Sequence, residues 1–511
     1  MKKSAKILSL LLAVIFLVSA LAACGGNPAE STKPNDTQTQ KPADSDGNDR
    51  NNVKDTVPTD LKFPNETVTF YVRNDADIYL YELACDELKN DTLYDAIHYR
   101  NIDVENRLGL KIRTVGQPGT YSDATTWNQT FSTSVLTNTG DYDAAAFYLS
   151  TGSPMAKDGI FYNVLNLTSE YGDGYFNFSK PWWNQTMVDE LTVYGAMFFV
   201  GGDLTISETA AGYGLFFNKD IFNRKFPEIG TTSLYQTVRD GKWTIDKMTD
   251  FVSQAWEDTN NNGVIDDGDT VGIRTAAIGN SDGQMDAWIY AMGLELTTKN
   301  EFGEPVLALL NNGGKTVSTY ETVRKLISGN PGALLLNDSN KTETAFKNNN
   351  QLFANYFLRT GASLRESTIN YGIIPLPKLN EDQEEYHSAF GNSGSAIGIA
   401  SCLKADRAAM VSAVMEVLAA ESYKQVTPAY YETVLQGQYS KEEADAEMYD
   451  MILKSFVFSF GYAYSTKSLG GVGSIFRDMS PSYDIQTTLE SKKTSWETNL
   501  AELLTALEEH S

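Results

Sequence analysis

The region from residue 68 to residue 149 alternates strands and helices in an order that few folds accommodate. Residues 68–74 (VTFYVRN) alternate β-branched and aromatic residues with others, which predicts a strand. Residues 91–109 have apolar residues at helical spacing, with Asp91 as a start signal and a glycine at the end. A strand at 110–115, a polar helix and a buried strand within 140–149 complete the series. This order predicts a doubly wound α/β unit with a parallel sheet.

Polar residues follow the first and third strands of this unit. Asn74 and Asp75 come directly after the first strand, and Tyr148 and Ser150 end the third. Ligands of open α/β sheets bind at the carboxyl ends of the strands. We therefore expect these four residues to contact a ligand.

Further elements follow, and the middle of the chain indicates a second unit of mixed helices and strands. The chain has 511 residues, a length that suggests two or more domains. Helices are expected at 244–256, with Thr244 as N-cap, at 406–423 and at 482–510. Strands are expected at 351–357, 370–377 and 394–401.

The N-terminus has the features of an export signal. Three lysines precede the apolar run of residues 7–23, which ends in LAAC. This ending is similar to the lipobox of bacterial lipoproteins, whose cysteine, here Cys24, is lipidated. The alternative is a plain secretory signal. Residues 24–57 have almost no large apolar side chain, so we expect a disordered tether. The chain is then held on the extracellular face of the bacterial cell membrane by its lipid alone.

Charge and residue counts exclude several classes of function. Removal of residues 1–23 takes away three lysines, so 38 basic and 66 acidic residues leave a charge of −28. Such a chain is a poor nucleic-acid binder, because binding requires basic side chains at the phosphates. Beyond Cys24 only Cys85 and Cys402 remain, either as free thiols or as one bridge. Three histidines cannot build a histidine-rich zinc centre, and no nucleophile elbow, phosphate loop or zinc-protease motif occurs.

Several stretches, taken in order, resemble one family. They are KPWWNQTMVDELTVYGAMFFVGGD, GYGLFFNKDIF before KWTIDKMTDF, and NYGIIPLPKLNEDQEEYHSAFGNSGSAIGIAS. Together with the lipobox they resemble extracellular solute-binding protein family 1, the carbohydrate receptors of ABC importers. The resemblance implies a periplasmic-binding-protein-like type II fold, with two α/β lobes joined by crossing hinge strands. By analogy lobe 1 holds residues 58–200 and a return segment at 388–430. Lobe 2 holds residues 201–387 and the C-terminal helices at 431–511.

The resemblance also indicates further ligand contacts. Sugars offer flat apolar faces rimmed by hydroxyls, so a binder needs aromatic platforms edged by planar polar groups. Trp183, Trp288 and Tyr356 are the candidate platforms, and Asp286 lies on the same side as Trp288 if that segment is extended. The alternative for each aromatic residue is the hydrophobic core, and for the aspartate a cap or surface charge.

Residues 258–270 (DTNNNGVIDDGDT) match a calcium loop position by position. Calcium prefers six to eight oxygen ligands and a glycine at the sixth position of its loop, where Gly263 stands. An aspartate takes the twelfth position instead of the usual glutamate, and no exiting helix or second loop follows. We expect one structural Ca²⁺; the alternative is a polar turn. The predicted ligands are Asp258, Asn260, Asn262, the Val264 carbonyl, Asp266 and Asp269.

The sequence therefore predicts a non-enzymatic, monomeric, lipid-anchored receptor. It would capture a carbohydrate, most simply an oligosaccharide, by hinge closure and deliver it to an ABC permease. A surface glycoside hydrolase, which needs two facing carboxylates, and a receptor for a peptide or another non-sugar solute are the alternatives.

Overall fold

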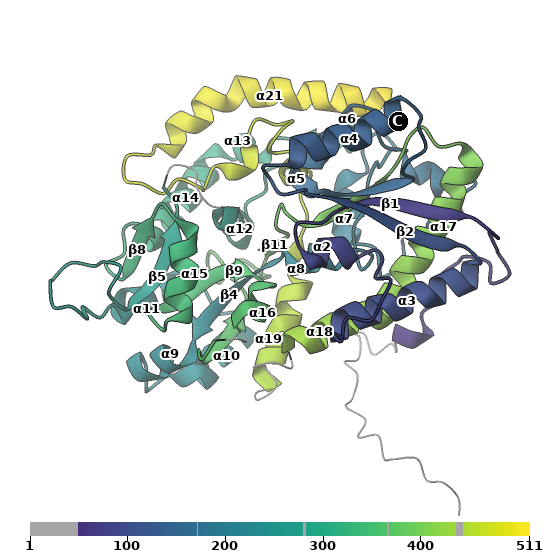
Figure 1. The fold of residues 1–511 in the computed structure, drawn as a ribbon. Coiled ribbons are helices and arrows are strands. Elements are labelled where there is room, and N and C mark those ends of the chain that lie inside the picture. The colour runs from purple at the N-terminus through teal and green to yellow at the C-terminus, as the bar shows by residue number, and fades with distance from the viewer. Residues whose placement is uncertain (1–49, 171, 279–282, 365–366, 436–442) are drawn as a thin grey trace, which may run out of the picture. The chain divides into compact units, whose positions relative to one another are not determined.

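The computed structural model describes residues 50–170, 172–278, 283–364, 367–435 and 443–511. The export signal, Cys24 and most of the predicted tether lie outside these residues. Residues 44–511 form one compact unit, and Figure 1 shows its elements. None of the described helices is long and apolar enough to cross a membrane.

The end of the predicted tether is ordered, which corrects that prediction for residues 50–57. A short 3-10 helix, η1, spans Arg50–Asn52. Val57 is 3% exposed within the core. The Asp55 carboxylate accepts two hydrogen bonds from Arg107, at 2.6 and 2.7 Å. The buried Val57 side chain and the bidentate ion pair between Asp55 and Arg107 hold this segment in place, although its composition is almost wholly polar.

The first sheet has the order β12-β3-β1-β2. Strands β1 (Thr67–Arg73), β2 (Lys111–Gln117) and β3 (Ala144–Tyr148) run parallel, as the sequence predicts. Strand β12 (Ser395–Ile399) pairs antiparallel with β3. It returns from a point in the sequence after all the strands of the second sheet. We call this sheet and its helices the first lobe.

Local signals set the helices of the first lobe. Helix α3 (Thr92–Leu108) begins at Asp91, whose side chain accepts hydrogen bonds from the backbone N–H groups of the next turn. It ends at Gly109, whose φ of 70° suits a residue without a Cβ. Helix α4 (Ala124–Leu136) is the predicted polar helix.

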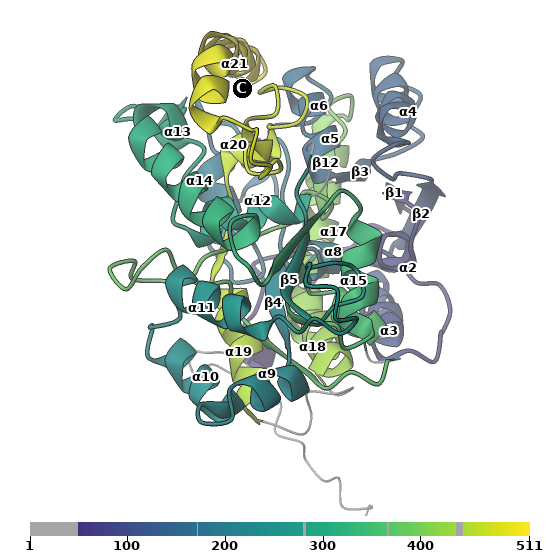
Figure 2. The ribbon, with the colours of Figure 1, turned by 90° about the vertical axis from the view of Figure 1, so that its left-hand side faces the viewer.

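The second sheet has the order β10-β4-β9-β5-β8. Its strands are β4 (Tyr213–Asn218), β5 (Val271–Ala276), β8 (Ala333–Leu336), β9 (Gln351–Phe357) and β10 (Tyr371–Ile374). Strand β5 runs parallel to β8 and β9, whereas β4 runs antiparallel to β9 and β10. Figure 2 shows α11 (Ile245–Ala255) and α15 (Ser339–Lys347) flanking this sheet. We call this sheet and its helices the second lobe.

Short strands accompany the chain where it passes between the two lobes. Strand β11 (Ser388–Ala389) pairs parallel with β13 (Phe456–Val457), and Gly212 bridges to Phe390. Each lobe thus has one antiparallel strand reached by a crossing segment. The predicted fold class, two α/β lobes joined by crossing strands, is confirmed. The residue boundaries assigned to the lobes stay a prediction.

The long C-terminal helix touches both lobes. Helix α21 (Ile485–Glu509) contacts α14 (Gly313–Ile327) of the second lobe and α6 (Pro154–Lys157) beside the first sheet. It runs along one edge of the unit in Figure 1. Its predicted apolar face is buried at Leu489, Trp496, Leu500, Leu503 and Leu507.

The remaining elements connect and cover the sheets. They are α2 (Asp77–Tyr81), α5 (Leu149–Gly152), η2 (Val164–Leu167), α7 (Gln185–Leu191), α8 (Ile206–Ala210), α9 (Lys219–Lys225), α10 (Gly230–Arg239), η3 (Gly283–Met285), α12 (Asp286–Ala291), β6 (Thr298–Lys299), β7 (Pro305–Val306), α13 (Ala308–Asn311), α16 (Thr360–Leu364), α17 (Ala405–Glu421), the π-helix η4 (Ser422–Val426), α18 (Thr427–Leu435), α19 (Glu443–Lys454), α20 (Phe460–Ala463) and η6 (Val472–Ser474).

Candidate ligand-binding cleft

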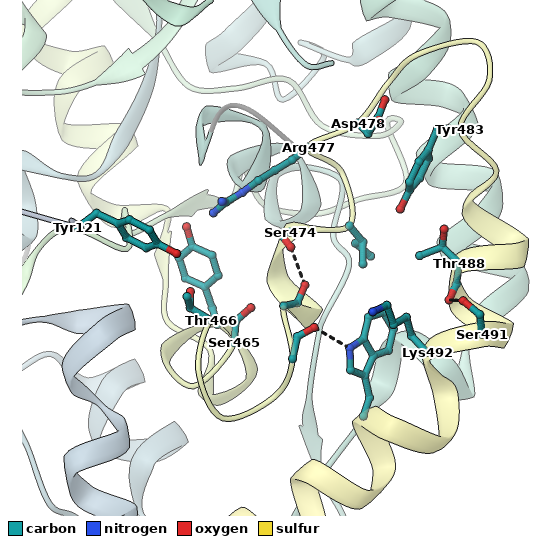
Figure 3. A pocket seen from close by; sticks show the side chains of 15 residues that line it. Tyr121, Ser465, Thr466, Ser474, Arg477, Asp478, Tyr483, Thr488, Ser491 and Lys492 are labelled. Atoms are coloured by element: carbon teal, nitrogen blue, oxygen red, sulfur yellow. Dashed lines mark hydrogen bonds between the residues drawn. The ribbon is translucent and has the colours of Figure 1, made fainter. Parts of the chain in front are cut away.

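A cavity of about 560 Å³ lies between a loop of the first lobe and the C-terminal segment (Figure 3). The first lobe contributes Tyr121, from the loop after β2, with 58% of the residue exposed. The C-terminal segment contributes both aromatic and polar side chains. These lining residues are Tyr462, Ser465, Thr466, Gly470, Gly471, Ser474, Ile475, Arg477, Asp478, Tyr483, Thr488, Ser491, Lys492 and Trp496.

A buried carboxylate fixes the arginine of this cavity. Asp286, at the start of α12, is fully buried. Its two oxygens accept hydrogen bonds from Arg477 Nε at 2.7 Å and Nη2 at 2.5 Å. The Tyr462 hydroxyl donates to Oδ2 at 2.8 Å. The forked geometry holds the guanidinium plane, and Figure 3 shows Arg477 and Tyr121 pointing toward one another.

Tyr121 links the cavity to the carboxyl end of β3. Its ring meets the ring of Tyr148 edge-on, with centroids 6.2 Å apart. Tyr148 is half-buried and donates a hydrogen bond from its hydroxyl to Asn392 Oδ1 at 3.2 Å. Burial raises the pKa of Tyr148 to about 12, so this hydroxyl keeps its proton at neutral pH. Aromatic rings with hydroxyl and amide edges suit the faces and rims of a sugar.

Two more arginines lie at this end of the first sheet. Arg73, the last residue of β1, donates to the Ser393 carbonyl at 2.8 Å, and its guanidinium lies over the Tyr148 ring at 5.1 Å. Arg359, which follows β9 of the second lobe, points both Nη atoms at Ser393 Oγ, at 3.3 Å each. The two lobes therefore place guanidinium groups on either side of one residue.

Tyr148, Ser150, Asn74 and Asp75 all lie at the strand ends where they were predicted. Ser150 is 1% exposed, and its Oγ has no hydrogen-bond partner among the described residues. Asn74 and Asp75 are exposed, and Asp75 Oδ1 accepts a hydrogen bond from the Gly119 amide at 3.2 Å. Their contact with a ligand stays a prediction.

The three predicted aromatic platforms lie in the hydrophobic core, so the structure favours the alternative for each. Trp183 is 2% exposed and packs edge-on against Phe176, while its Nε1 donates to Glu416. Trp288 and Tyr356 are 1% and 2% exposed. Burial of large aromatic rings stabilises the fold more than exposure at a rim would, and the sequence pattern cannot separate the two roles.

The expectation for residues 286–288 is also corrected in its geometry. This segment is helical rather than extended, because it forms the first turn of α12. Side chains two residues apart on a helix diverge, so Asp286 and Trp288 do not share a face. Asp286 faces Arg477 at the cavity, whereas Trp288 enters the core.

The residues that form the C-terminal wall of the cavity were not predicted from the sequence to bind a ligand. Residues 461–478 (GYAYSTKSLGGVGSIFRD) have no helical or strand periodicity and combine glycine, serine and tyrosine. Such a composition marks a loop, and loops carry binding residues disproportionately often. Tyr121, in a short loop between a strand and a helix, gave no comparable signal.

Four of the predicted calcium ligands lie around one another. Asn260 and Asn262 donate side-chain hydrogen bonds to Asp266 Oδ2 at 2.9 and 2.6 Å. The backbone amides of Asn262 and Gly263 donate to the Asp258 carboxylate at 3.1 and 2.7 Å. Gly263 has a φ of 75°, the sharp turn for which the pattern requires glycine. Each side chain carries an oxygen of the kind that a hard cation prefers, although in this arrangement the amide nitrogens of Asn260 and Asn262 face Asp266.

Asp269, at the twelfth position, fits this role less well. Its carboxylate is fully buried and accepts hydrogen bonds from Trp256 Nε1, the Thr259 amide and the Asp266 amide at 3.0, 3.0 and 3.2 Å. These donors lower the pKa of Asp269, with the Trp256 bond as the largest cause. The Asp269 carboxylate therefore stabilises the conformation of the loop through these three hydrogen bonds. Among the described residues, no three acidic, histidine or cysteine side chains gather closely enough to hold a metal by themselves.

Comparisons with known proteins establish the fold. Neither a family model nor a curated protein matches this chain. Solved structures do match. An ABC substrate-binding protein of Listeria monocytogenes in complex with cycloalternan has a TM-score of 0.53 at 13% identity, covering 86% of this chain and 99% of its own. A cyclo/maltodextrin-binding protein with maltotetraose gives 0.53 at 12%, covering 88% and 98%. A maltodextrin-binding domain of Bdellovibrio bacteriovorus bound to maltotriose gives 0.50 at 11%, covering 85% and 100%.

Proposed function

We propose that this chain is a substrate-binding protein that captures a carbohydrate, most simply an oligosaccharide, for an ABC importer. Its two lobes would close over the ligand without making or breaking a covalent bond. The likeness in fold to proteins described as binding cycloalternan, maltotetraose and maltotriose supports a carbohydrate over a peptide. At this level of identity the likeness does not name the sugar.

The observation that carries this proposal is the make-up of the cavity. Exposed Tyr121 enters it from the first lobe and half-buried Tyr483 from the C-terminal segment, while Tyr462 and Trp496 line it from buried positions. Hydroxyls, one arginine and one lysine lie between these rings. Flat apolar platforms with interspersed hydrogen-bonding groups are what a sugar ring requires, and a volume of about 560 Å³ is within the usual range for ligand pockets.

The cavity gives no support to the hydrolase alternative. A glycosidase places two carboxyl groups about 5–9.5 Å apart across the bond to be cleaved. Asp478 is the one acidic side chain among the residues that line the cavity. Asp286 is bound to Arg477 and Tyr462, which leaves it no role as an acid or base.

The test is a binding screen of the full chain, in detergent where lipidated, against a panel of neutral and acidic oligosaccharides. We expect one class to raise the melting temperature with no new reducing ends after prolonged incubation. X-ray scattering should show a smaller radius of gyration with that sugar. New reducing ends would favour the hydrolase, and stabilisation by peptides alone would favour the non-sugar receptor.

We also propose that the chain is anchored through a lipid on Cys24, which supports a place on the outer face of the cell membrane. The lipobox and its apolar run support this, and ABC import requires the receptor to stay near its permease. Mass spectrometry of the native protein should find an acylated N-terminal cysteine. A Cys24→Ala variant should leave the membrane fraction, and retention of that variant would contradict the anchor.

We propose one structural Ca²⁺ in the loop of residues 258–270, bound by Asp258, Asn260, Asn262, the Val264 carbonyl and Asp266. The match to the loop pattern and the sharp turn at Gly263 support this. Asp269 is better assigned a structural role in the loop. To bind a cation, its carboxylate would have to give up the hydrogen bonds that it accepts from Trp256 Nε1 and the Thr259 amide. Outside the cell, calcium is abundant enough for a weak site to fill.

A further inference from the structure

Two guanidinium groups beside Tyr148, next to the cavity but not among the residues that line it, lack an acidic partner. Neither Arg73 nor Arg359 forms an ion pair within 4.0 Å with any acidic side chain of the described residues. The chain has 66 acidic and 41 basic residues, so unpaired arginines in its interior are not a result of scarcity. Arg477, by contrast, is paired with Asp286 at 2.5 Å.

Arg73 is a buried charge with incomplete hydrogen bonding. The residue is 1% exposed, and its Nε is buried without an acceptor among the described residues. Nη2 donates to the Ser393 carbonyl and to Ser395 Oγ at 2.8 and 2.9 Å, and the Tyr79 ring lies 3.7 Å from the guanidinium. Neutral acceptors and rings do not neutralise a cation, and an uncompensated buried charge is costly.

The nearest buried acid does not remove this imbalance. Glu82 is fully buried and interacts electrostatically with Arg73, but burial raises the pKa of its carboxyl. No oxygen of Glu82 lies within 4.0 Å of a guanidinium nitrogen of Arg73, and its Oε2 accepts a hydrogen bond from the Ser207 amide at 3.3 Å, so the two side chains form no ion pair. Gly119 lies against the aliphatic part of the Arg73 side chain, where a Cβ would come within 2.4 Å of Cγ.

Arg359 is the more exposed of the two cations. It is half-buried, and its guanidinium stacks on the Phe357 ring at 4.0 Å, which fixes its plane. Its two hydrogen bonds to Ser393 Oγ are long, at 3.3 Å each, and both go to one neutral hydroxyl. A carboxylate or sulfate would offer it two charged acceptors in the fork geometry that guanidinium prefers.

We infer that the captured saccharide is anionic and carries a carboxylate, as in a uronic acid, or a sulfate ester. Arg359 binds the anionic group directly, and Arg73, beneath Tyr148, contributes the second positive charge. This assignment rests on the proposed function, because it concerns the ligand of the same cleft. A neutral sugar would leave both guanidinium groups uncompensated when the lobes close and exclude water.

The test measures affinity by calorimetry with the full chain and four tetrasaccharides. These are an oligogalacturonide, its methyl ester, maltotetraose and O-sulfated maltotetraose. Each charged sugar has a neutral partner of the same backbone, so shape and charge are separated, and the two pairs distinguish carboxylate from sulfate. We expect one charged form to bind at least about tenfold more tightly than its neutral partner, with an affinity that falls as salt rises.

Substitutions test whether Arg359 is the residue that causes the preference for the charged sugar. Arg359→Gln should abolish the preference for the charged form, and Arg359→Lys should retain part of it. Arg113→Gln, a change at an exposed arginine of β2 without a described ion pair, is the matched control and should keep the full preference. A neutral sugar bound as tightly as its charged partner would overturn the inference and leave the proposed receptor intact. A preference that survives in Arg359→Gln would overturn the role of Arg359. If the folded wild-type chain binds neither charged tetrasaccharide but binds another neutral member of the wider oligosaccharide panel, the inference is overturned and the proposed function stands; if it binds no member of that panel, both are overturned.

Discussion

Replacement of Asp286 by asparagine tests whether the cleft depends on a buried charge. The substitution keeps the size of the side chain but removes the negative charge that faces Arg477. It also removes acceptors, since the Asp286 carboxylate takes two hydrogen bonds from Arg477 and one from Tyr462. Asp286 is 0% exposed, so no water replaces these interactions on its side.

The expected loss of stability is about 2–4 kcal/mol. Removal of one partner of a fully buried ion pair costs about 3–5 kcal/mol, because the other charge is left without compensation. The Arg477 side chain keeps 20% of its surface exposed, so water can partly solvate it in the variant, which lowers the expected cost by about 1 kcal/mol. We also expect weaker sugar binding, since Arg477 loses its fixed orientation at the cavity.

A double-mutant cycle with Arg477→Met supplies the assay. Unfolding in urea, followed by tryptophan fluorescence, gives the stability of the wild type, both single variants and the double variant. We expect the double variant to be at least about 1.5 kcal/mol more stable than the sum of the single effects predicts. Glu447→Gln, which breaks the surface pair with Arg239, is the control and should cost about 0–1 kcal/mol. Additivity of the two cavity substitutions within about 0.5 kcal/mol would refute the reasoning.

Three further predictions follow from single features of the structure. Burial raises the pKa of Glu416 to about 8, above an unfolded value of about 4.3, so the folded state retains a proton that the unfolded state loses. Stability should therefore fall as pH rises from about 4.3 to 8, and Glu416→Gln should flatten the profile of melting temperature against pH; an unchanged profile would contradict this. Chelation by EDTA should lower the melting temperature by several degrees in the wild type and not in the double variant Asp258→Asn, Asp266→Asn. An unchanged wild-type melting temperature and no metal by elemental analysis would count against the site. Cys85 and Cys402 are free thiols, so a reducing agent should leave the melting temperature unaltered, and a shift would indicate a bridge.

Local signals in the sequence were enough to place the elements of the first lobe. Asp91 and Gly109 bound α3 because capping and left-handed termination depend on one or two residues and their neighbours. The strands were likewise found from short alternating runs, and their order along the chain implied a parallel sheet. Strand β12 was expected from its own residues, but its return to the first lobe was expected only from a resemblance, since nothing in those residues indicates β3 as its partner.

The location of the cleft could be predicted only in part. Tyr148 was identified because strand ends in α/β sheets meet at one edge, which is a rule about topology. Arg477 and Tyr121 were not, because they lie more than 350 residues apart in the sequence and their proximity depends on how the last segment packs. The same limit applies to Trp183, Trp288 and Tyr356: an aromatic residue in a core and one at a sugar have the same local sequence.

The sequence by itself determined the excess of negative charge and the alternation of strands and helices, and it predicts an export signal and a calcium loop. Each of these is a property of composition or of residues within one turn or strand. The tertiary structure alone decided that Asp286 holds Arg477, that Arg73 and Arg359 meet at Ser393, and that the predicted platforms are buried. Charge compensation and burial depend on which distant segments come into contact, and a single sequence does not encode those distances locally.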